Sequence, residues 1–282
     1  MIAAGGETAP GHPEIVRITA PNPGPMTLEG TNTYVVSAAE GGYVIDPGPD
    51  DAEHLERVRR AAGEAGGIAG VLLTHGHSDH SAGVEPLGGP LLWGRASGEG
   101  EMEAMRRALE SGSVQASDEL LAGVGGNPSL AREIGPFTLV ATPGHAADHV
   151  AFVLGDVCFC GDLILGTGSS IVPPAAGGGS LTAYLSSLAA LDRFDLELLA
   201  PGHGPWVIDP TAKIAEYRDH RLDRERRLIA ALDQGERSRS ALLAQVWDDV
   251  PAQLRPAAAI AMQAHVEKLA AEGRLAADEL VD

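Results

Sequence analysis

Short apolar runs alternate with helical patterns along the first 210 residues of the chain. Two of these runs, at 33–37 and 43–45, flank a glycine-containing turn and are typical of a β-hairpin. A helix is expected over 51–65, where Leu55 and Val58 form a thin apolar stripe. Further strands are predicted over 14–19, 70–74, 137–141, 150–154, 157–160 and 196–200, and a helix follows the leucines between 181 and 191. Many short strands interleaved with helices indicate a layered α/β architecture.

The pattern changes after Pro210. Gly273 ends the last predicted helix, and residues 275–276 are expected to begin a short β element. Three helices with a short β element are typical of a winged helix. We therefore divide the chain into a large α/β domain over 1–210 and a winged-helix-like domain over 211–282. The three helices are predicted over 214–232, 240–247 and 255–272.

The net charge of the chain limits its partners. Its 282 residues are 44% hydrophobic, which is enough for a sizeable core, but 20 basic residues stand against 39 acidic ones and give a net charge of −19. Residues 1–210 contain 9 basic and 26 acidic residues (−17) and no lysine, and residues 211–282 contain 11 and 13 (−2). Such a surface repels polyanions, which disfavours tight, sequence-independent nucleic-acid binding by the large domain.

Neither a membrane location nor a disulfide framework is expected. No apolar run reaches the roughly 18 to 20 residues that a membrane span requires, and the first ten residues lack the pattern of a secretory signal. The only cysteines, Cys158 and Cys160, are separated by one residue in a predicted strand and are poorly placed to bridge each other. We therefore expect a cytoplasmic protein with no membrane partner.

A loop dense in metal-ligand side chains follows the predicted strand at 70–74. Its residues, Thr-His-Gly-His-Ser-Asp-His, contain His75, His77, Asp79 and His80. The alternate spacing of His75 and His77 allows both imidazoles to converge on one ion, while Asp79 and His80 face a second ion beside it. Imidazole nitrogens and carboxylate oxygens are ligands that Zn²⁺ accepts.

Three more candidate ligands follow other predicted strands. His145 comes after Thr142-Pro143-Gly144, Asp162 after Gly161, and His203 after Pro201-Gly202. The carboxyl ends of strands are where α/β sheets place their ligands. Together with the histidine-rich loop, these residues make two sets of three ligands and one carboxylate able to bridge them. The sequence therefore predicts a two-metal site.

The motifs HxHxDH, TPGH, GD and PGHG, in this order, resemble those of the metallo-β-lactamase superfamily. The segments PGPMTLEGTNTY at 23–34, GDLILG at 161–166 and YRDHR at 217–221 are similar to those of its β-lactamase-like protein 2 family. The similarity extends over about 14–275. It implies an αββα sandwich, which is the catalytic domain, followed by a winged-helix-like domain.

The resemblance also implies a ligand set and a chemistry. It assigns His75, His77 and His145 to a first metal and Asp79, His80 and His203 to a second, with Asp162 bridging them and Asp79 and Asp162 serving catalysis. Two zinc ions, with manganese or iron as alternatives, would hold a bridging hydroxide whose parent water has its pKa lowered to about 7. True β-lactamases of the superfamily lack the bridging aspartate, so hydrolysis of antibiotics is disfavoured.

Three further residues are candidates for a supporting role. Asp46 either orients a ligand histidine or caps the Pro-Gly turn that follows it. His149 either assists the site or is structural, and Asn32 borders the pocket.

The loops 93–130 and 166–180 are expected to set the substrate range. Histidines outside the motifs are treated as surface residues (His12, His54, His220 and His265), and the arginines between 218 and 227 as a solvated helix face or, alternatively, a phosphate-binding strip.

Two activities compete for this site. The resembled family implies a phosphodiesterase that cleaves single-stranded RNA, which the winged helix and the arginine strip favour and the acidic charge opposes. The alternative is a thioesterase acting on acyl-CoA, acyl-carrier protein or a related thioester, because members of the superfamily hydrolyse thioesters. A true β-lactamase and a non-enzymatic metal- or DNA-binding regulator are the least favoured functions. Assembly into a homo-oligomer is left open.

Overall fold

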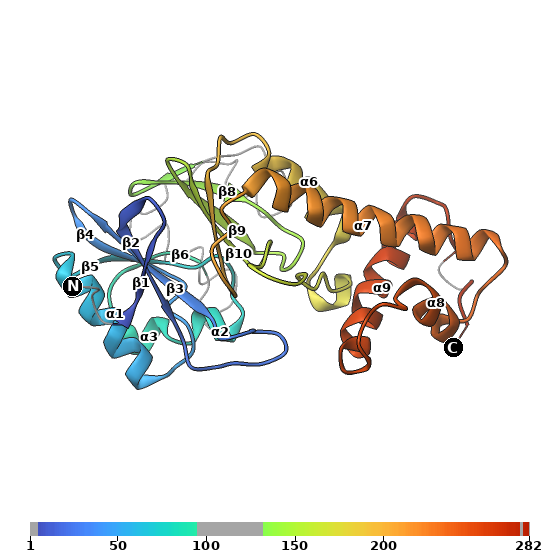
Figure 1. The fold of residues 1–282 in the computed structure, drawn as a ribbon, viewed down its shortest axis with the longest axis horizontal. Coiled ribbons are helices and arrows are strands. Elements are labelled where there is room, and N and C mark those ends of the chain that lie inside the picture. The colour runs from blue at the N-terminus through green and yellow to red at the C-terminus, as the bar shows by residue number, and fades with distance from the viewer. Residues whose placement is uncertain (1–4, 95–131, 277–278, 282) are drawn as a thin grey trace.

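Two β-sheets face each other in the N-terminal part of the chain (Figure 1). This computed structural model describes residues 5–94, 132–276 and 279–281. The first sheet has the order β1-β2-β3-β4-β5-β6, formed by Glu7–Ala9, His12–Thr19, Asn32–Ala38, Gly41–Ile45, Ile68–Leu72 and Leu91–Trp93. The second has the order β11-β10-β9-β8-β7, formed by Leu198–Pro201, Val157–Gly161, Val150–Leu154, Phe137–Ala141 and Arg132–Ile134.

The predicted hairpin and the helix after it are present. Strands β3 and β4 pair antiparallel with Tyr34 opposite Ile45, whereas β4 and β5 run parallel. Parallel neighbours need a crossover connection, which α1 (Ala52–Glu64) supplies. The Asp51 side chain accepts a hydrogen bond from the backbone N–H of His54 at 2.8 Å and caps the start of α1.

Hydrophobic residues fill three layers of this domain. Between the sheets, Tyr34 and Ile45 pack with Phe137 and Phe159, and the rings of Tyr34 and Phe159 lie 5.3 Å apart. The outer face of the first sheet is covered by α1, and that of the second by α6 (Leu181–Leu191) and α7 (Pro210–Asp233) (Figure 1). The predicted αββα arrangement is therefore confirmed.

The long helix α7 runs from the sandwich into the C-terminal helices (Figure 1). Its second half packs with α8 (Arg239–Val246) and α9 (Arg255–Ala271) around a separate core that includes Leu228, Leu242 and Met262. The expected β element at 275–276 is wrong, because Leu275 is buried in this core and lies outside any strand. An isolated bridge instead joins Ser238 to Val281. Short helices also occur at Ser78–Ser81 (α2), Val84–Leu87 (α3), Ala175–Gly177 (η2) and Ala252–Leu254 (η3).

Several residues expected on the surface are buried. His54 and His265 expose only 1% and 2% of their surface, because helical spacing directs His54 against β3 and His265 against α7. Arg221 and Arg224 are also buried, so the arginines of α7 do not form one solvated face. Arg224 pairs with Asp249 at 2.7 Å, and its guanidinium lies 5.7 Å from the centre of the Trp247 ring.

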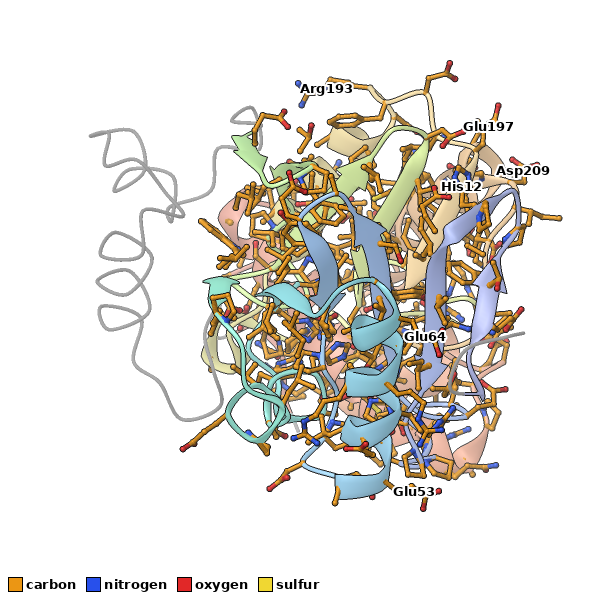
Figure 2. All side chains as sticks on the ribbon, turned by 90° about the vertical axis from the view of Figure 1, so that its left-hand side faces the viewer. His12, Glu53, Glu64, Arg193, Glu197 and Asp209 are labelled. Carbon is orange, nitrogen blue, oxygen red and sulfur yellow. The ribbon has the colours of Figure 1, made fainter. Side chains whose placement is uncertain are left out.

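Acidic side chains lie on the outside of the sandwich, as Glu53 and Glu197 do at opposite edges of Figure 2. Among the described residues, no helix is both long enough and apolar enough to cross a membrane.

Cys158 and Cys160 are free thiols in the core, and burial raises the pKa of Cys158 to about 12. The predicted absence of a disulfide between them is confirmed.

The stability of the C-terminal helices is expected to fall on acidification because of His265. Burial, together with the charges of Arg221 and Lys268, lowers the pKa of His265 from 6.5 to about 3. Below pH 6.5, His265 therefore binds a proton in the unfolded chain but stays neutral in the folded chain. The free energy of unfolding consequently decreases as the pH falls from 6.5 toward 3. The melting temperature should drop between about pH 7.5 and about pH 5, and less in His265→Gln. An equal drop in both proteins would contradict this role for His265.

Candidate metal centre

All seven predicted ligands come shortly after the ends of strands. His75 and His77 lie on the loop after β5, Asp79 and His80 lie in α2, which that loop enters, and His145 follows β8. Asp162 directly follows β10, and His203 follows β11. Strands β10 and β11 are parallel neighbours, which brings Asp162 and His203 to the same edge of the second sheet. A Cβ atom at Gly202 would lie only 2.3 Å from Asp162 Oδ1, so the glycine before His203 allows this close approach.

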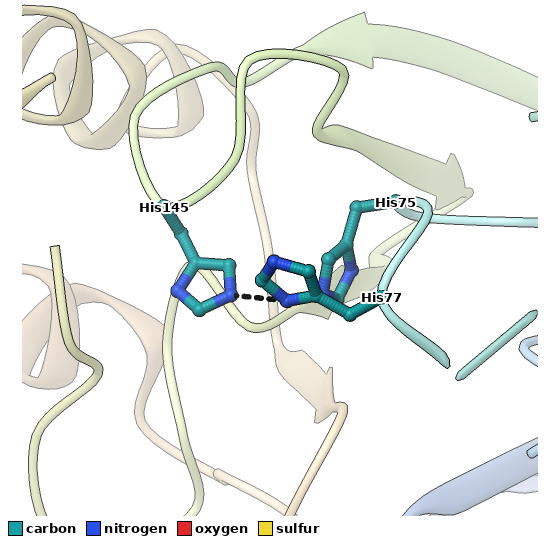
Figure 3. A group of neighbouring side chains, drawn as sticks. All are labelled: His75, His77 and His145. Atoms are coloured by element: carbon teal, nitrogen blue, oxygen red, sulfur yellow. Dashed lines mark hydrogen bonds between the residues drawn. The ribbon is translucent and has the colours of Figure 1, made fainter. Parts of the chain in front are cut away.

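Three imidazole nitrogens meet in the first group. His75 Nε2 lies 2.9 Å from His77 Nδ1, and His145 Nε2 lies 3.1 Å from the same atom (Figure 3). His75 and His145 are buried, whereas His77 is exposed at the edge of the site. The loop after β5 and the loop after β8 thus direct nitrogens to one point, as the spacing of the sequence predicts.

The second group joins a carboxylate to two further histidines. Asp79 Oδ2 lies 3.3 Å from His203 Nε2 and 3.4 Å from His80 Nε2. Asp162 stands between the two groups, because its Oδ1 lies 3.4 Å from His203 Nε2 while its Oδ2 lies 3.7 Å from His145 Nε2. Asp162 also forms a compact set of three possible donors with His75 and His80. The position of Asp162 is one from which a carboxylate can contact both groups.

Asp46 orders the histidine-rich loop from behind. Its Oδ1 accepts the backbone N–H of Thr74 at 2.8 Å, and its Oδ2 accepts the Thr74 hydroxyl at 2.7 Å. His80 Nδ1 lies 2.9 Å from the same Oδ2 and donates to it, because a carboxylate oxygen accepts. The Thr74 hydroxyl, having given its proton to Asp46, accepts from His75 Nδ1 at 3.1 Å. The Nε2 lone pairs of His75 and His80 are thereby directed into the site.

Backbone carbonyls fix two other imidazoles in the same way. His145 Nδ1 donates to the carbonyl of Ile171 at 2.8 Å, and His203 Nδ1 donates to that of Gly30 at 3.2 Å. Since a carbonyl oxygen can only accept, each ring carries a proton on Nδ1, and in the neutral imidazole this leaves the Nε2 lone pair facing inward and available to an ion. This is the arrangement that orients metal-binding histidines in proteins.

The carboxylates of the site impose strong pKa shifts on their neighbours. Burial opposes the charged forms, but Asp162 and Asp46 outweigh it and raise the pKa of His80 well above its ordinary value. Asp162 likewise raises the pKa of His203 to about 9 against the effect of burial. The histidines in turn outweigh burial at the carboxyls and lower the pKa of Asp79 to about 2. The Asp79 and Asp162 carboxylates thus require positive charge beside them, supplied either by protons on these histidines or by cations.

The donor set fits divalent metal ions. Nitrogens bound to one tetrahedral zinc at about 2.0–2.1 Å lie roughly 3.3 Å apart, close to the spacings in the first group. Lone pairs that face each other repel unless a cation lies between them. His80 Nε2 and Asp162 Oδ1 are buried and have no hydrogen-bond partner within the described part of the chain. Such orphaned atoms carry a cost that a bound cation would remove.

The two remaining candidate residues have different surroundings. Asn32 is buried and donates from Nδ2 to the carbonyls of Pro201 and Gly204 at 3.0 and 2.8 Å, which holds the loop of His203. His149 Nδ1 lies 2.8 Å from the Thr142 hydroxyl, and burial lowers the pKa of His149 to about 3. Neither side chain reaches into the group of donors, so a direct part in catalysis stays a prediction for both.

Sequence reasoning overlooked residues whose roles depend on distant contacts. Thr31 donates to Asp79 Oδ2 at 3.3 Å, and Ser170 Oγ lies 3.3 Å from His145 Nδ1. Thr74 stood next to the motif and was missed because a threonine ending a strand has many uses. Of the two loops expected to set the substrate range, residues 95–130 lie outside the described residues, while 166–180 passes directly behind His145.

Replacing Asp46 by alanine is expected to weaken both metal binding and the fold. The change leaves the buried N–H of Thr74 without its acceptor, at a cost of about 1–3 kcal/mol in the free energy of unfolding. It also frees His80, and losing a group that orients a ligand typically costs about 10- to 100-fold in metal affinity. Chelator competition and thermal melting measure the two effects, with the exposed Asp50→Ala as control. An Asp46→Ala protein that binds metal like the parent would remove Asp46 from the site.

Two family descriptions match the chain. The model of the metallo-beta-lactamase superfamily matches residues 26–203, and that of the beta-lactamase associated winged helix domain matches residues 238–280. The second match confirms the predicted winged helix, although it begins 28 residues beyond Pro210, where α7 starts.

Relatives and solved structures agree with these matches. The chain is 31% identical to the beta-lactamase-like protein 2 homolog of Drosophila melanogaster, over 95% of this chain and 91% of that protein. It is 33% identical to an atrochrysone carboxyl ACP thioesterase of Aspergillus chevalieri, over 78% of this chain and 66% of that protein. A beta-lactamase domain protein from Burkholderia ambifaria has the same fold, with a TM-score of 0.69, 20% identity and coverage of 99% and 94% of the two chains.

Proposed function

Given that the chain belongs to the metallo-beta-lactamase superfamily of hydrolases, we propose that its site holds two zinc ions and hydrolyses a thioester. One observation carries the metal part of this proposal. Three imidazole nitrogens of His75, His77 and His145 face one another at 2.9 and 3.1 Å, with the buried Asp162 carboxylate beside them. A divalent cation accounts for this arrangement, because the Nδ1 protons of His75 and His145 are directed elsewhere and both Nε2 lone pairs face His77 Nδ1.

The proposal assigns His75, His77 and His145 to one ion. Asp79, His80 and His203 would hold the other, and Asp162 would contact both. Two ions held there would lower the pKa of water to about 7 and would stabilise the negative charge that develops on the attacked group. Manganese or iron would satisfy the same donors, since imidazole and carboxylate suit several ions.

The residues of the chain have two tasks in this reaction. Asp46 and Thr74 fix the direction of two imidazoles, so that little reorganisation is needed when the substrate arrives. Asp79 stays ionised at neutral pH, with its pKa lowered to about 2, and keeps its negative charge in the site. The thiolate that leaves a thioester needs little help from a general acid, because its conjugate thiol has a pKa of about 8.5.

Charge and relatedness favour a thioester as the substrate. The ACP thioesterase from Aspergillus chevalieri matches over 78% of the chain. Four of the five arginines that were considered as a phosphate-binding strip have acidic partners, as Arg218 does with Asp192 at 3.4 Å and Arg227 with Asp248 at 2.6 Å, and the fifth, Arg221, is buried. Paired arginines on a protein of net charge −19 are poor ligands for a polyanion.

Single-stranded RNA is the second candidate substrate. The match to a winged helix domain at 238–280 favours it, as does the resemblance of the motifs to the β-lactamase-like protein 2 family. Residues 1–210 contain no lysine, which opposes it.

We further propose a domain boundary at 210/211, where α7 begins.

A parallel assay separates the two substrates. The zinc-loaded protein is given an acyl-CoA and a single-stranded RNA, and His77→Ala is tested beside it. We expect thioester turnover that disappears in the variant and no cleavage of the RNA. Cleavage of RNA that depends on His77, with the thioester untouched, would overturn the thioester proposal and retain the metal site.

A further inference from the structure

We infer that Arg221, on helix α7, is a positioning residue for His145, and that α7 thereby sets the metal affinity of the first group. The inference rests on the proposed function, because His145 matters only if it binds an ion. Arg221 itself lies outside the group of donors. Its effect would pass through the segment 162–171, which runs from Asp162 past the back of the His145 ring.

Hydrogen bonds to Ser170 and Ile171 connect the guanidinium to the imidazole. Arg221 Nη2 donates to the backbone carbonyl of Ser170. The Ser170 hydroxyl donates to the carbonyl of Asp162 at 2.5 Å, which leaves its lone pairs to face His145 Nδ1 at 3.3 Å. The next carbonyl, that of Ile171, accepts from the same Nδ1 at 2.8 Å. The peptide unit held by Arg221 therefore joins the two residues that fix the direction of His145.

Other residues of the C-terminal helices hold the same segment. The Tyr217 hydroxyl accepts from the N–H of Leu165 at 3.0 Å and donates to the carbonyl of Gly168 at 2.9 Å. On α9, Glu267 accepts at 2.8 Å from the N–H of Ala175, four residues beyond this segment. The loop behind the first group is thus braced by two helices that come later in the chain.

The burial of Arg221 is costly, which makes a purely stabilising role a poor explanation. Its surface is only 5% exposed, and no carboxylate of the described chain forms an ion pair with it. Its Nε is buried without a hydrogen-bond partner among the described residues, and its charge lies 5.3 Å from the centre of the Tyr184 ring. An apolar side chain of similar length would avoid this cost but would not hold Ser170.

The test compares metal affinity with stability. The variants are Arg221→Met, Arg221→Lys and Ser170→Ala, and Arg218→Met is the control, because Arg218 lies on the same helix with 42% of its side chain exposed. Metal affinity is measured by competition with a chelator. Amide exchange at Leu165 and Gly166 is measured in the metal-free protein, so that movement of the segment is seen without any ion.

Arg221→Met and Ser170→Ala should bind the first metal about tenfold more weakly, in the range found for groups that orient a ligand. In Arg221→Met the amides of Leu165 and Gly166 should also exchange faster, while the melting temperature should equal that of the Arg218→Met control. Arg221→Lys, which keeps a donor, should recover part of the affinity. Unchanged affinity and exchange in both Arg221→Met and Ser170→Ala would overturn the inference. A parent protein that takes up no metal would overturn the proposed function, and the exchange data would still decide whether Arg221 holds the segment.

Discussion

Replacing His77 by alanine is expected to abolish hydrolysis while the protein remains folded. His77 supplies the nitrogen that the other two histidines of the first group approach at 2.9 and 3.1 Å. Loss of a ligand should cost more than the roughly 10- to 100-fold caused by losing a group that only orients one. The side chain is exposed, so its truncation should change the free energy of unfolding by less than about 0.5 kcal/mol.

The measurement is turnover together with the number of metal ions per chain. His12→Ala is the matched control, because His12 lies on β2 and pairs with Glu14 and Asp156, away from the site. The control should keep full metal content and rate. Undiminished hydrolysis at full metal content in His77→Ala would refute the assignment of His77.

Replacing Asp162 by asparagine is expected to cost far more activity than stability. The Asp162 carboxylate stands 3.4 Å from His203 Nε2 and 3.7 Å from His145 Nε2, so one side chain faces both groups. Asparagine keeps the shape but removes the charge that attracts two cations, and we expect a loss of at least about 100-fold in kcat/KM, comparable to that for removing one preorganised electrostatic contact. The pKa values of His80 and His203 in the metal-free protein should fall, since Asp162 helps to raise both.

The loss of stability in Asp162→Asn should be smaller than the loss of activity, because Oδ1 of the parent carboxylate is buried without a hydrogen-bond partner in the described structure. Steady-state kinetics and thermal melting measure the two effects. Asp156→Asn, on the turn between β9 and β10, is the control. Equal kcat/KM for Asp162→Asn and the parent protein would remove Asp162 from the site.

The sheets could be predicted because local patterns determine where strands lie. The bounds of β8 and β9 are those expected, and α1 differs from its prediction by one residue at each end. The surroundings of polar side chains could not be predicted in the same way. His265 is buried because α7 and Trp247 pack against it, and those partners lie 18 or more residues away in the sequence.

The candidate site, too, could be predicted only where local sequence determines it. The close spacing in the histidine-rich loop made convergence of His75 and His77 predictable from local sequence alone. The supporting partners of His145 and His203 could not be predicted in this way, because the carbonyls of Ile171 and Gly30 belong to the backbone and leave no mark in the residue types. Ser170 and Arg221 act through contacts between segments 51 residues apart, which only the folded chain reveals.

The most direct test of the two-metal site is anomalous diffraction from crystals of the zinc-loaded protein, collected at the zinc absorption edge. Two peaks are predicted, one among His75, His77 and His145 and the other among Asp79, His80 and His203. They should lie about 3.5–4 Å apart with Asp162 between them. A single peak, or peaks away from these side chains, would contradict the account.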